Sequence, residues 1–113
     1  MDPFFIGALV LLLAYFFFFR PKPDIDGPGA RALVKEGALL LDERTDGEFS
    51  AGHLTGAKHI PLHDLERRAK KELDKSRTIV VYCRSGARSG QAKKLLAGLG
   101  FEKIRDLGGM SRW

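Results

Sequence analysis

The stretch TIVVYCRSGARS, residues 78–89, decides the fold of this chain. Its opening residues, 78–82, are β-branched or aromatic and form an apolar run of strand length, which predicts a strand that is buried on both faces. A short loop follows it, and residues 88–99 have helical spacing that ends at Gly98 or Gly100. A buried strand that runs through a short loop into a helix is a unit of an α/β fold.

The residues on either side repeat this alternation of strands and helices. We predict further strands over 38–41, 58–60 and 103–107, and helices over 30–36 and 64–73. Elements of these lengths in this order indicate an α/β domain with a mainly parallel central sheet and helices on both faces. Ligands bind to such sheets at the carboxyl ends of the strands, and Cys83 directly follows the clearest of them.

The N-terminal segment differs in composition from the rest of the chain. Residues 4–19, FFIGALVLLLAYFFFF, carry no charge, and a helix of that length spans about 24 Å. This is slightly short for a bilayer core, but bilayer thinning and snorkelling of basic side chains can absorb the mismatch. A cleaved signal peptide would have a basic start and small residues at its end, and neither is present. We therefore predict one transmembrane helix, an anchor over residues 1–20.

This interpretation divides the chain into three parts: the anchor, a linker over 21–29 rich in Pro and Gly, and one domain over 30–113. Arg20 and Lys22 follow the apolar segment, and the positive-inside tendency then predicts a single-pass membrane protein whose domain faces the cytoplasm.

Charge gives little information about partners. The chain has 19 Lys and Arg residues against 14 acidic ones, and opposite charges are interspersed through most of the domain. A nucleic-acid-binding protein would show a basic face with interleaved aromatic residues, whereas most of the phenylalanines here lie in the N-terminal segment. We predict a membrane contact through residues 4–19 and no nucleic-acid partner.

Cys83 is the one cysteine of the sequence, which excludes an intrachain disulfide, a CxxC redox pair and a thiolate-rich zinc site. A lone cysteine is more often a small buried apolar residue than a nucleophile. Here, however, the backbone amides of the loop and the following helix N-terminus form an anion cradle that stabilises a thiolate. Arg84 and Arg88 add positive charge, although Arg84 could be a solvated residue and Arg88 could pair with a carboxylate. We predict that Cys83 is a nucleophile.

Four separated motifs resemble those of the rhodanese family. They are CRSGARS (83–89), which resembles its active-site loop, LLDER followed by EF (40–44 and 48–49), GHLTGAKHIP (52–61) and GGMSRW (108–113). The resemblance covers about residues 25–113, and four motifs in the right order make it far more specific than the loop alone.

The resemblance implies a rhodanese-like fold and a sulfurtransferase that needs no metal or organic cofactor. Its cysteine would take a sulfane sulfur from a small anionic donor such as thiosulfate, or from a persulfide, and pass it to a thiol or cyanide-like acceptor, either a small molecule or a protein. Cys83 would be the nucleophile, and Asp42 and Arg44 would support the site from the adjacent strand end. The donor and the persulfide would be held by the loop residues Arg84, Ser85, Gly86, Ala87, Arg88 and Ser89.

Two other functions remain open. A docking module could use the same fold at a membrane without turnover. In the related phosphatases the cysteine and arginine enclose five residues, whereas here they enclose the four residues 84–87, which disfavours a phosphatase. Metal binding is also disfavoured, because Pro61 lies between His59 and His63 and argues against both on one helical turn.

Overall fold

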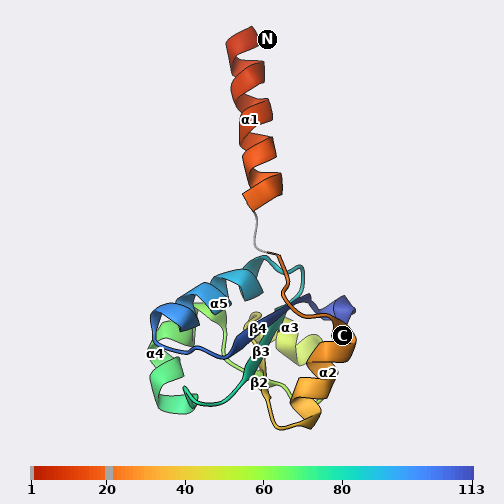
Figure 1. Ribbon diagram of the computed structural model, residues 1–113, viewed down its shortest axis with the longest axis vertical. Coiled ribbons are helices and arrows are strands. Elements are labelled where there is room, and N and C mark those ends of the chain that lie inside the picture. The colour runs from red at the N-terminus through yellow and green to blue at the C-terminus, as the bar shows by residue number, and fades with distance from the viewer. Residues whose placement is uncertain (1, 20–21) are drawn as a thin grey trace.

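The structure is a computed structural model that describes residues 2–19 and 22–113. Met1, Arg20 and Pro21, which belong to the predicted anchor, linker and positive flank, lie outside the described residues. Helix α1, Pro3–Phe19, stands apart from the α/β domain in Figure 1. Its 17 residues reach about 25 Å, against about 30 Å for a bilayer core. Across the described ranges no helix has the length and apolar character needed to cross a membrane, so the predicted transmembrane helix is not supported.

The central sheet has four strands, all parallel, in the order β2-β1-β3-β4. The strands are β1 (Leu39–Asp42), β2 (Lys58–His59), β3 (Ile79–Cys83) and β4 (Ile104–Gly109). The helices are α2 (Gly27–Lys35), α3 (Asp46–Ala51), α4 (Leu62–Glu72) and α5 (Ala87–Gly98). The predicted α/β class and parallel sheet are confirmed.

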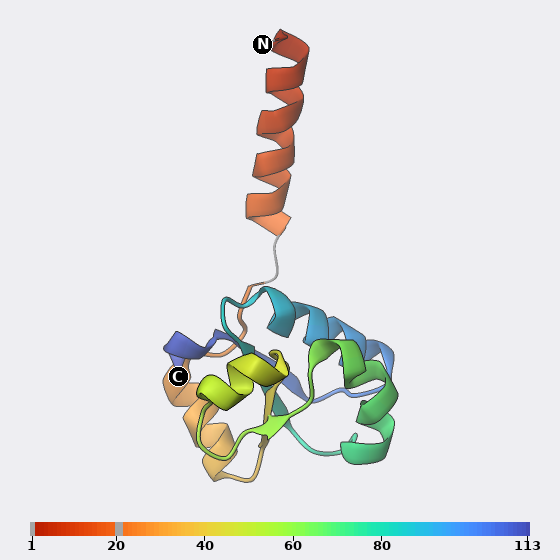
Figure 2. The same cartoon turned by 180° about the vertical axis from the view of Figure 1, so that it is seen from behind.

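Strand alternation divides the core into two layers, one on each face of the sheet. Leu41 and Val81 point toward α4 and α5, which contribute Leu65, Ala69 and Leu96. The residues between them on each strand point the other way and pack beneath α2. The views from opposite sides in Figures 1 and 2 show α2 on one side of the sheet and α4 with α5 on the other. Helices therefore cover both faces, as predicted.

Local capping explains two differences from the predicted elements. Helix α2 begins at Gly27 rather than at residue 30, because the Asp26 side chain accepts a hydrogen bond from the Gly29 amide and Pro28 lies in the first turn. Helix α3 was not predicted. It is a short helix that starts with a capping box, in which Thr45 and Glu48 each bind the other's backbone amide.

Strand β4 is longer than predicted and continues through Gly108 and Gly109. A register shift beside Val81 and Tyr82 brings these glycines opposite Tyr82 and Cys83. A one-turn 3₁₀-helix, Met110–Arg112, follows. The two glycines therefore lie beside the end of β3, which carries the predicted nucleophile Cys83.

The chain that precedes α2 lies along β4. The amides of Asp24 and Ile25 donate to the Asp106 carbonyl at 2.9 and 3.3 Å, and the Asp106 amide donates back to the Asp24 carboxylate at 2.8 Å. Lys93 of α5 pairs with the same carboxylate. These contacts satisfy part of an edge strand that would otherwise present open backbone groups.

Candidate active site

Cys83 is the last residue of β3 and is fully buried. Its Sγ accepts a hydrogen bond from the Gly86 amide at 2.9 Å and lies 3.6 Å from the Ser89 Oγ. The Ser89 hydroxyl in turn donates to the Gly86 carbonyl at 3.0 Å. We call residues 83–89 the Cys83 loop, because these bonds fold its backbone around the sulfur atom.

Gly86 makes this loop possible. Its φ of 99° lies in the left-handed region, where a residue with a Cβ is strained, and it directly precedes α5. No side chain caps the N-terminus of α5. The first amides of the helix and their partial positive charge therefore face the end of the loop that carries Cys83.

The two glycines of β4 allow close packing against the loop. A Cβ on Gly109 would lie 2.9 Å from the Arg84 carbonyl oxygen, which is too close for any real side chain. A Cβ on Gly86 would lie 3.6 Å from the Cα of Gly108. Because they have no side chains, Gly108 and Gly109 thus allow the backbone of the Cys83 loop to pack directly against β4.

Arg88 is half-buried and is held by a carboxylate, one of the alternatives that the sequence left open. Its Nη1 and Nη2 donate to the two oxygens of Glu48 at 2.5 and 2.8 Å. The hydrogen bonds from Arg88 hold the pKa of Glu48 well below its usual value. Since Glu48 is also part of the α3 capping box, this ion pair joins α3 to the Cys83 loop.

The other loop residues differ in exposure. Arg84, Ser85 and Ala87 are exposed, whereas Ser89 is buried beside the sulfur. Arg84 has no side-chain hydrogen bond or ion pair to any residue in the described ranges. Its charge is therefore available at the mouth of the loop, while the charge of Arg88 is partly neutralised.

Asp42 and Arg44 form a buried network on the opposite face of the sheet from Cys83. The Arg44 Nε and Nη2 donate to the Asp42 carboxylate at 2.8–3.0 Å, and the Tyr82 hydroxyl donates to it at 2.7 Å. Arg44 also donates to the Gly52 carbonyl at 2.6 Å, and the Leu54 amide donates to Tyr82 at 3.0 Å. These bonds tie the ends of β1 and β3 to the loop after α3 without touching the cysteine.

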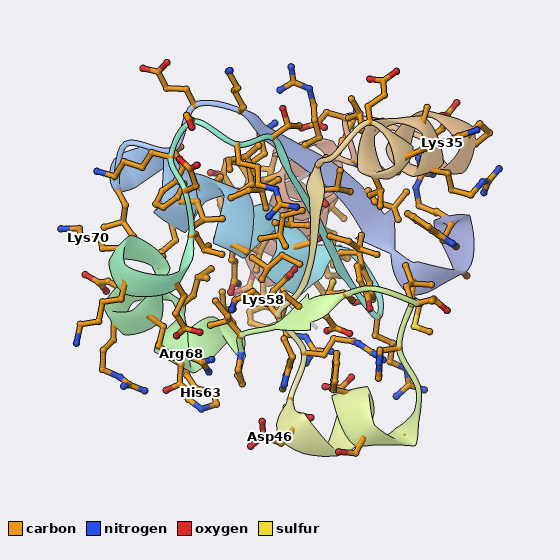
Figure 3. The ribbon with its side chains drawn as sticks, turned by 90° about the horizontal axis from the view of Figure 1, so that it is seen from below. Lys35, Asp46, Lys58, His63, Arg68 and Lys70 are labelled. Atoms are coloured by element: carbon orange, nitrogen blue, oxygen red, sulfur yellow. The ribbon has the colours of Figure 1, made fainter. Side chains whose placement is uncertain are left out.

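The histidines take part in packing and backbone contacts. The His53 Nδ1 lies 2.9 Å from the Phe49 carbonyl oxygen, and the two rings stack at 3.7 Å. The His59 Nε2 lies 2.7 Å from the Arg44 carbonyl oxygen. His63 is exposed at the start of α4, as Figure 3 shows. In the part of the chain that the structure describes, no three metal-binding side chains gather.

Glu43 is the site residue that sequence reasoning missed. It follows β1 and is only 1% exposed. Together with Arg88 it lines a pocket of about 290 Å³ that Thr45, Pro61, Leu62 and His63 complete. Strand alternation was the available signal, because Glu43 lies two residues after the core residue Leu41 and so points to the same side.

Comparison with known proteins agrees with the motifs. The model of the rhodanese-like domain family matches residues 29–113. A sulfurtransferase of Allochromatium vinosum is 37% identical over 91 residues, covering 80% of this chain and 84% of that protein. The thiosulfate sulfurtransferase PspE of Escherichia coli is 38% identical over 71 residues, covering 62% and 68%. For YqhL of Bacillus subtilis, 39% identical over 77 residues, the match spans only 60% of that protein.

Solved structures give the same result at the level of the fold. The rhodanese-like domain of the Anabaena protein Alr3790 has a TM-score of 0.72 at 33% identity, covering 81% of this chain and 73% of that one. The human single-domain sulfurtransferase TSTD1 has a TM-score of 0.66 at 26% identity, covering 81% and 92%.

Proposed function

The chain belongs to the rhodanese-like domain family of sulfurtransferases, and from that premise we propose that Cys83 carries a sulfane sulfur from thiosulfate or a persulfide donor to a nucleophilic acceptor. The observation that carries the proposal is the Cys83 loop. Its sulfur atom lies among a donating amide, a buried hydroxyl and a helix N-terminus. A buried apolar cysteine would need none of these.

The proposed reaction has two steps. In the first, the Cys83 thiolate attacks the sulfane sulfur of thiosulfate, the S–S bond of the donor breaks, and sulfite leaves with the electron pair. The outer sulfur of the resulting persulfide carries the negative charge. In the second, an acceptor nucleophile attacks that outer sulfur, the bond to the Cys83 Sγ breaks, and the thiolate is restored.

The loop residues divide this work according to their positions. The exposed Arg84 attracts the dianionic donor, and Arg88 holds it at the loop while Glu48 fixes the guanidinium in place. Amides of Ser85, Gly86, Ala87, Arg88 and Ser89 stabilise the outer sulfur of the persulfide. The Gly86 amide donates to the Cys83 Sγ and Glu48 orients Arg88, so we expect little reorganisation in the first step.

Mass measurement of the intact protein tests the proposal. Incubation with thiosulfate is expected to add one sulfur atom, about 32 Da, and later addition of cyanide is expected to remove it. Protein whose thiol has first been alkylated is the control and should gain nothing. If neither thiosulfate nor a low-molecular-weight persulfide produces the adduct, the chain does not work as a sulfurtransferase, and a docking module becomes the better reading.

We also propose that α1 attaches the domain to a membrane, with the domain on the cytoplasmic side. The support is the apolar surface of α1, where large side chains such as Phe4, Leu11 and Leu12 are 63–89% exposed. A single-pass arrangement stays a prediction. In a flotation assay we expect the full chain to rise with lipid vesicles, and a variant with Leu11→Asp and Leu12→Asp to remain below. A parent chain that stays below would contradict membrane attachment.

A further inference from the structure

Glu43 is a buried acid without a partner. Both of its carboxyl oxygens are inaccessible to solvent and have no hydrogen-bond partner among the described residues. Buried carboxyl groups almost always have hydrogen bonds or a cationic partner, because an isolated one is costly. A buried carboxyl group with no hydrogen bond next to the nucleophile is costly for the fold, which indicates that it has a function there.

The sheet places Glu43 next to Cys83. Leu41 pairs with Val81 on the neighbouring strand, and Glu43 and Cys83 each follow two residues later on the same face. Neighbouring strands lie about 4.8 Å apart, so an acid on one strand reaches a sulfur on the other. Glu43 also lines the pocket beside the Cys83 loop, whose other walls include Pro61 and Leu62. Glu43 is therefore a neighbour of the nucleophile through the sheet and also a wall of the pocket in which a second reactant could bind.

The surroundings favour the protonated form of this acid. Burial raises the pKa of Glu43 well above its usual value, and the charges of Cys83 and Asp42 raise it further. The other charged or titratable groups that face it are Asp106 on β4, Arg88 on α5 and His63 at the pocket rim. Three of these five groups are acidic: Asp42 on β1, Cys83 on the neighbouring strand β3, and Asp106 on β4 beyond it. Only Arg88 is a permanent cation, and Glu48 already pairs with it.

We propose that Glu43 is the general acid of the second step, in which the sulfur passes to a thiol acceptor bound in this pocket. The Glu43 carboxyl gives its proton to the anionic outer sulfur of the Cys83 persulfide. An acceptor thiolate then attacks that sulfur, the bond to Sγ breaks, and Cys83 leaves as the thiolate. The product persulfide departs as its anion and returns the proton to Glu43, so charge and protons balance. The inference rests on the proposed sulfurtransferase function.

Protonation matters here because two anions must meet. An anionic outer sulfur repels an incoming thiolate and is a poor electrophile, whereas the neutral form accepts the attack. The first step needs no such proton, because sulfite leaves as an anion. Glu43 should consequently affect the second step and leave the first nearly unchanged.

The test measures the two steps separately on the full chain. The parent, Glu43→Gln and the exposed control Glu66→Gln are loaded with thiosulfate, and persulfide formation is followed by mass. Transfer to thionitrobenzoate, an aromatic thiol that stays ionised across the pH range, is then followed in a single turnover. We expect Glu43→Gln to form the persulfide within about threefold of the parent rate but to transfer it about a hundredfold more slowly. Glu66→Gln should match the parent in both steps.

The pH profile separates a proton donor from a merely structural residue. In the parent, transfer should slow as pH rises through the raised pKa of Glu43, and Glu43→Gln should lose this dependence. Glu43→Asp, which keeps an acid, should retain the dependence at a reduced rate. If Glu43→Gln transfers sulfur at the parent rate with the parent pH profile, the inference is wrong although the sulfurtransferase stands. A parent chain that forms no persulfide overturns both.

Discussion

Cys83→Ser is expected to abolish sulfur transfer and leave the domain folded. A serine hydroxyl is not ionised near neutral pH and forms no stable bond to a sulfane sulfur, so no persulfide can form. The substitution is nearly isosteric at a fully buried position, and the serine Oγ can accept the same hydrogen bond from the Gly86 amide. We expect no mass gain with thiosulfate or a persulfide donor, and thiocyanate production at the rate of the uncatalysed reaction.

This variant also separates catalysis from docking. Its midpoint of thermal unfolding should stay within a few degrees of the parent value, which shows that any loss of activity is chemical. Binding of a protein partner that only recognises the surface of the fold should survive the change. Sulfur transfer by Cys83→Ser at a rate near that of the parent would exclude the persulfide mechanism altogether.

Asp42→Ala is expected to lower the free energy of unfolding by about 3–5 kcal/mol, the largest stability effect that we predict. Asp42 is fully buried and receives hydrogen bonds from the Arg44 amide, the Arg44 guanidinium and the Tyr82 hydroxyl. Its removal leaves a nearly buried guanidinium and a phenol without their acceptor. A domain of this size is usually stable by only about 5–15 kcal/mol, so the variant should lie near the limit of folding.

The controls for Asp42→Ala use its partner and pH. Combining it with Arg44→Met removes the unpaired charge, so the double variant should lose less unfolding free energy than the sum of the two single variants.

Burial alone would raise the pKa of Asp42, but the hydrogen bonds from Arg44 and Tyr82 outweigh it and hold that pKa below its usual value. Asp42 therefore stabilises the parent above the unfolded pKa of about 3.9, and this gain disappears as pH falls through the folded value. Chemical denaturation should show the gap between parent and variant narrowing in acid, and a constant gap would contradict this account.

Much of the fold could be predicted because its local signals agree with one another. The apolar run before Cys83 and the helical spacing after it specify a buried strand and a helix without any distant contact. The parallel order of the strands then follows from the helices between them. Helix α3 was not predicted because it is six residues long and has no buried residue, so its sequence shows no helical spacing of apolar residues.

Most residues of the site could be predicted from the sequence, but the contacts between them could not. The Cys83 loop was recognisable from seven consecutive residues. The bond from Arg88 to Glu48 joins residues 40 positions apart, and no local pattern chooses that carboxylate over the others. Glu43 was harder still, because a charged residue between Asp42 and Arg44 reads as part of a polar strand end. Strand alternation places its side chain on the core side, but the register of β1 against β3 is needed to place it beside the cysteine.

The contacts of Asp24 along β4 limit how far the Cys83 sulfur can lie from helix α1. Pro23 lies against Gly108, which supports the Cys83 loop, so the chain leaves the domain on the side of the active site. Phe19, the last residue of α1, is five residues from Asp24, and the covalent chain between them spans at most about 18 Å. Any support that binds α1 therefore keeps the persulfide that we propose for Cys83 within a short distance of that support. An acceptor on that same support would experience a millimolar-scale local concentration of the persulfide, and proximity rather than affinity would decide which acceptor receives the sulfur.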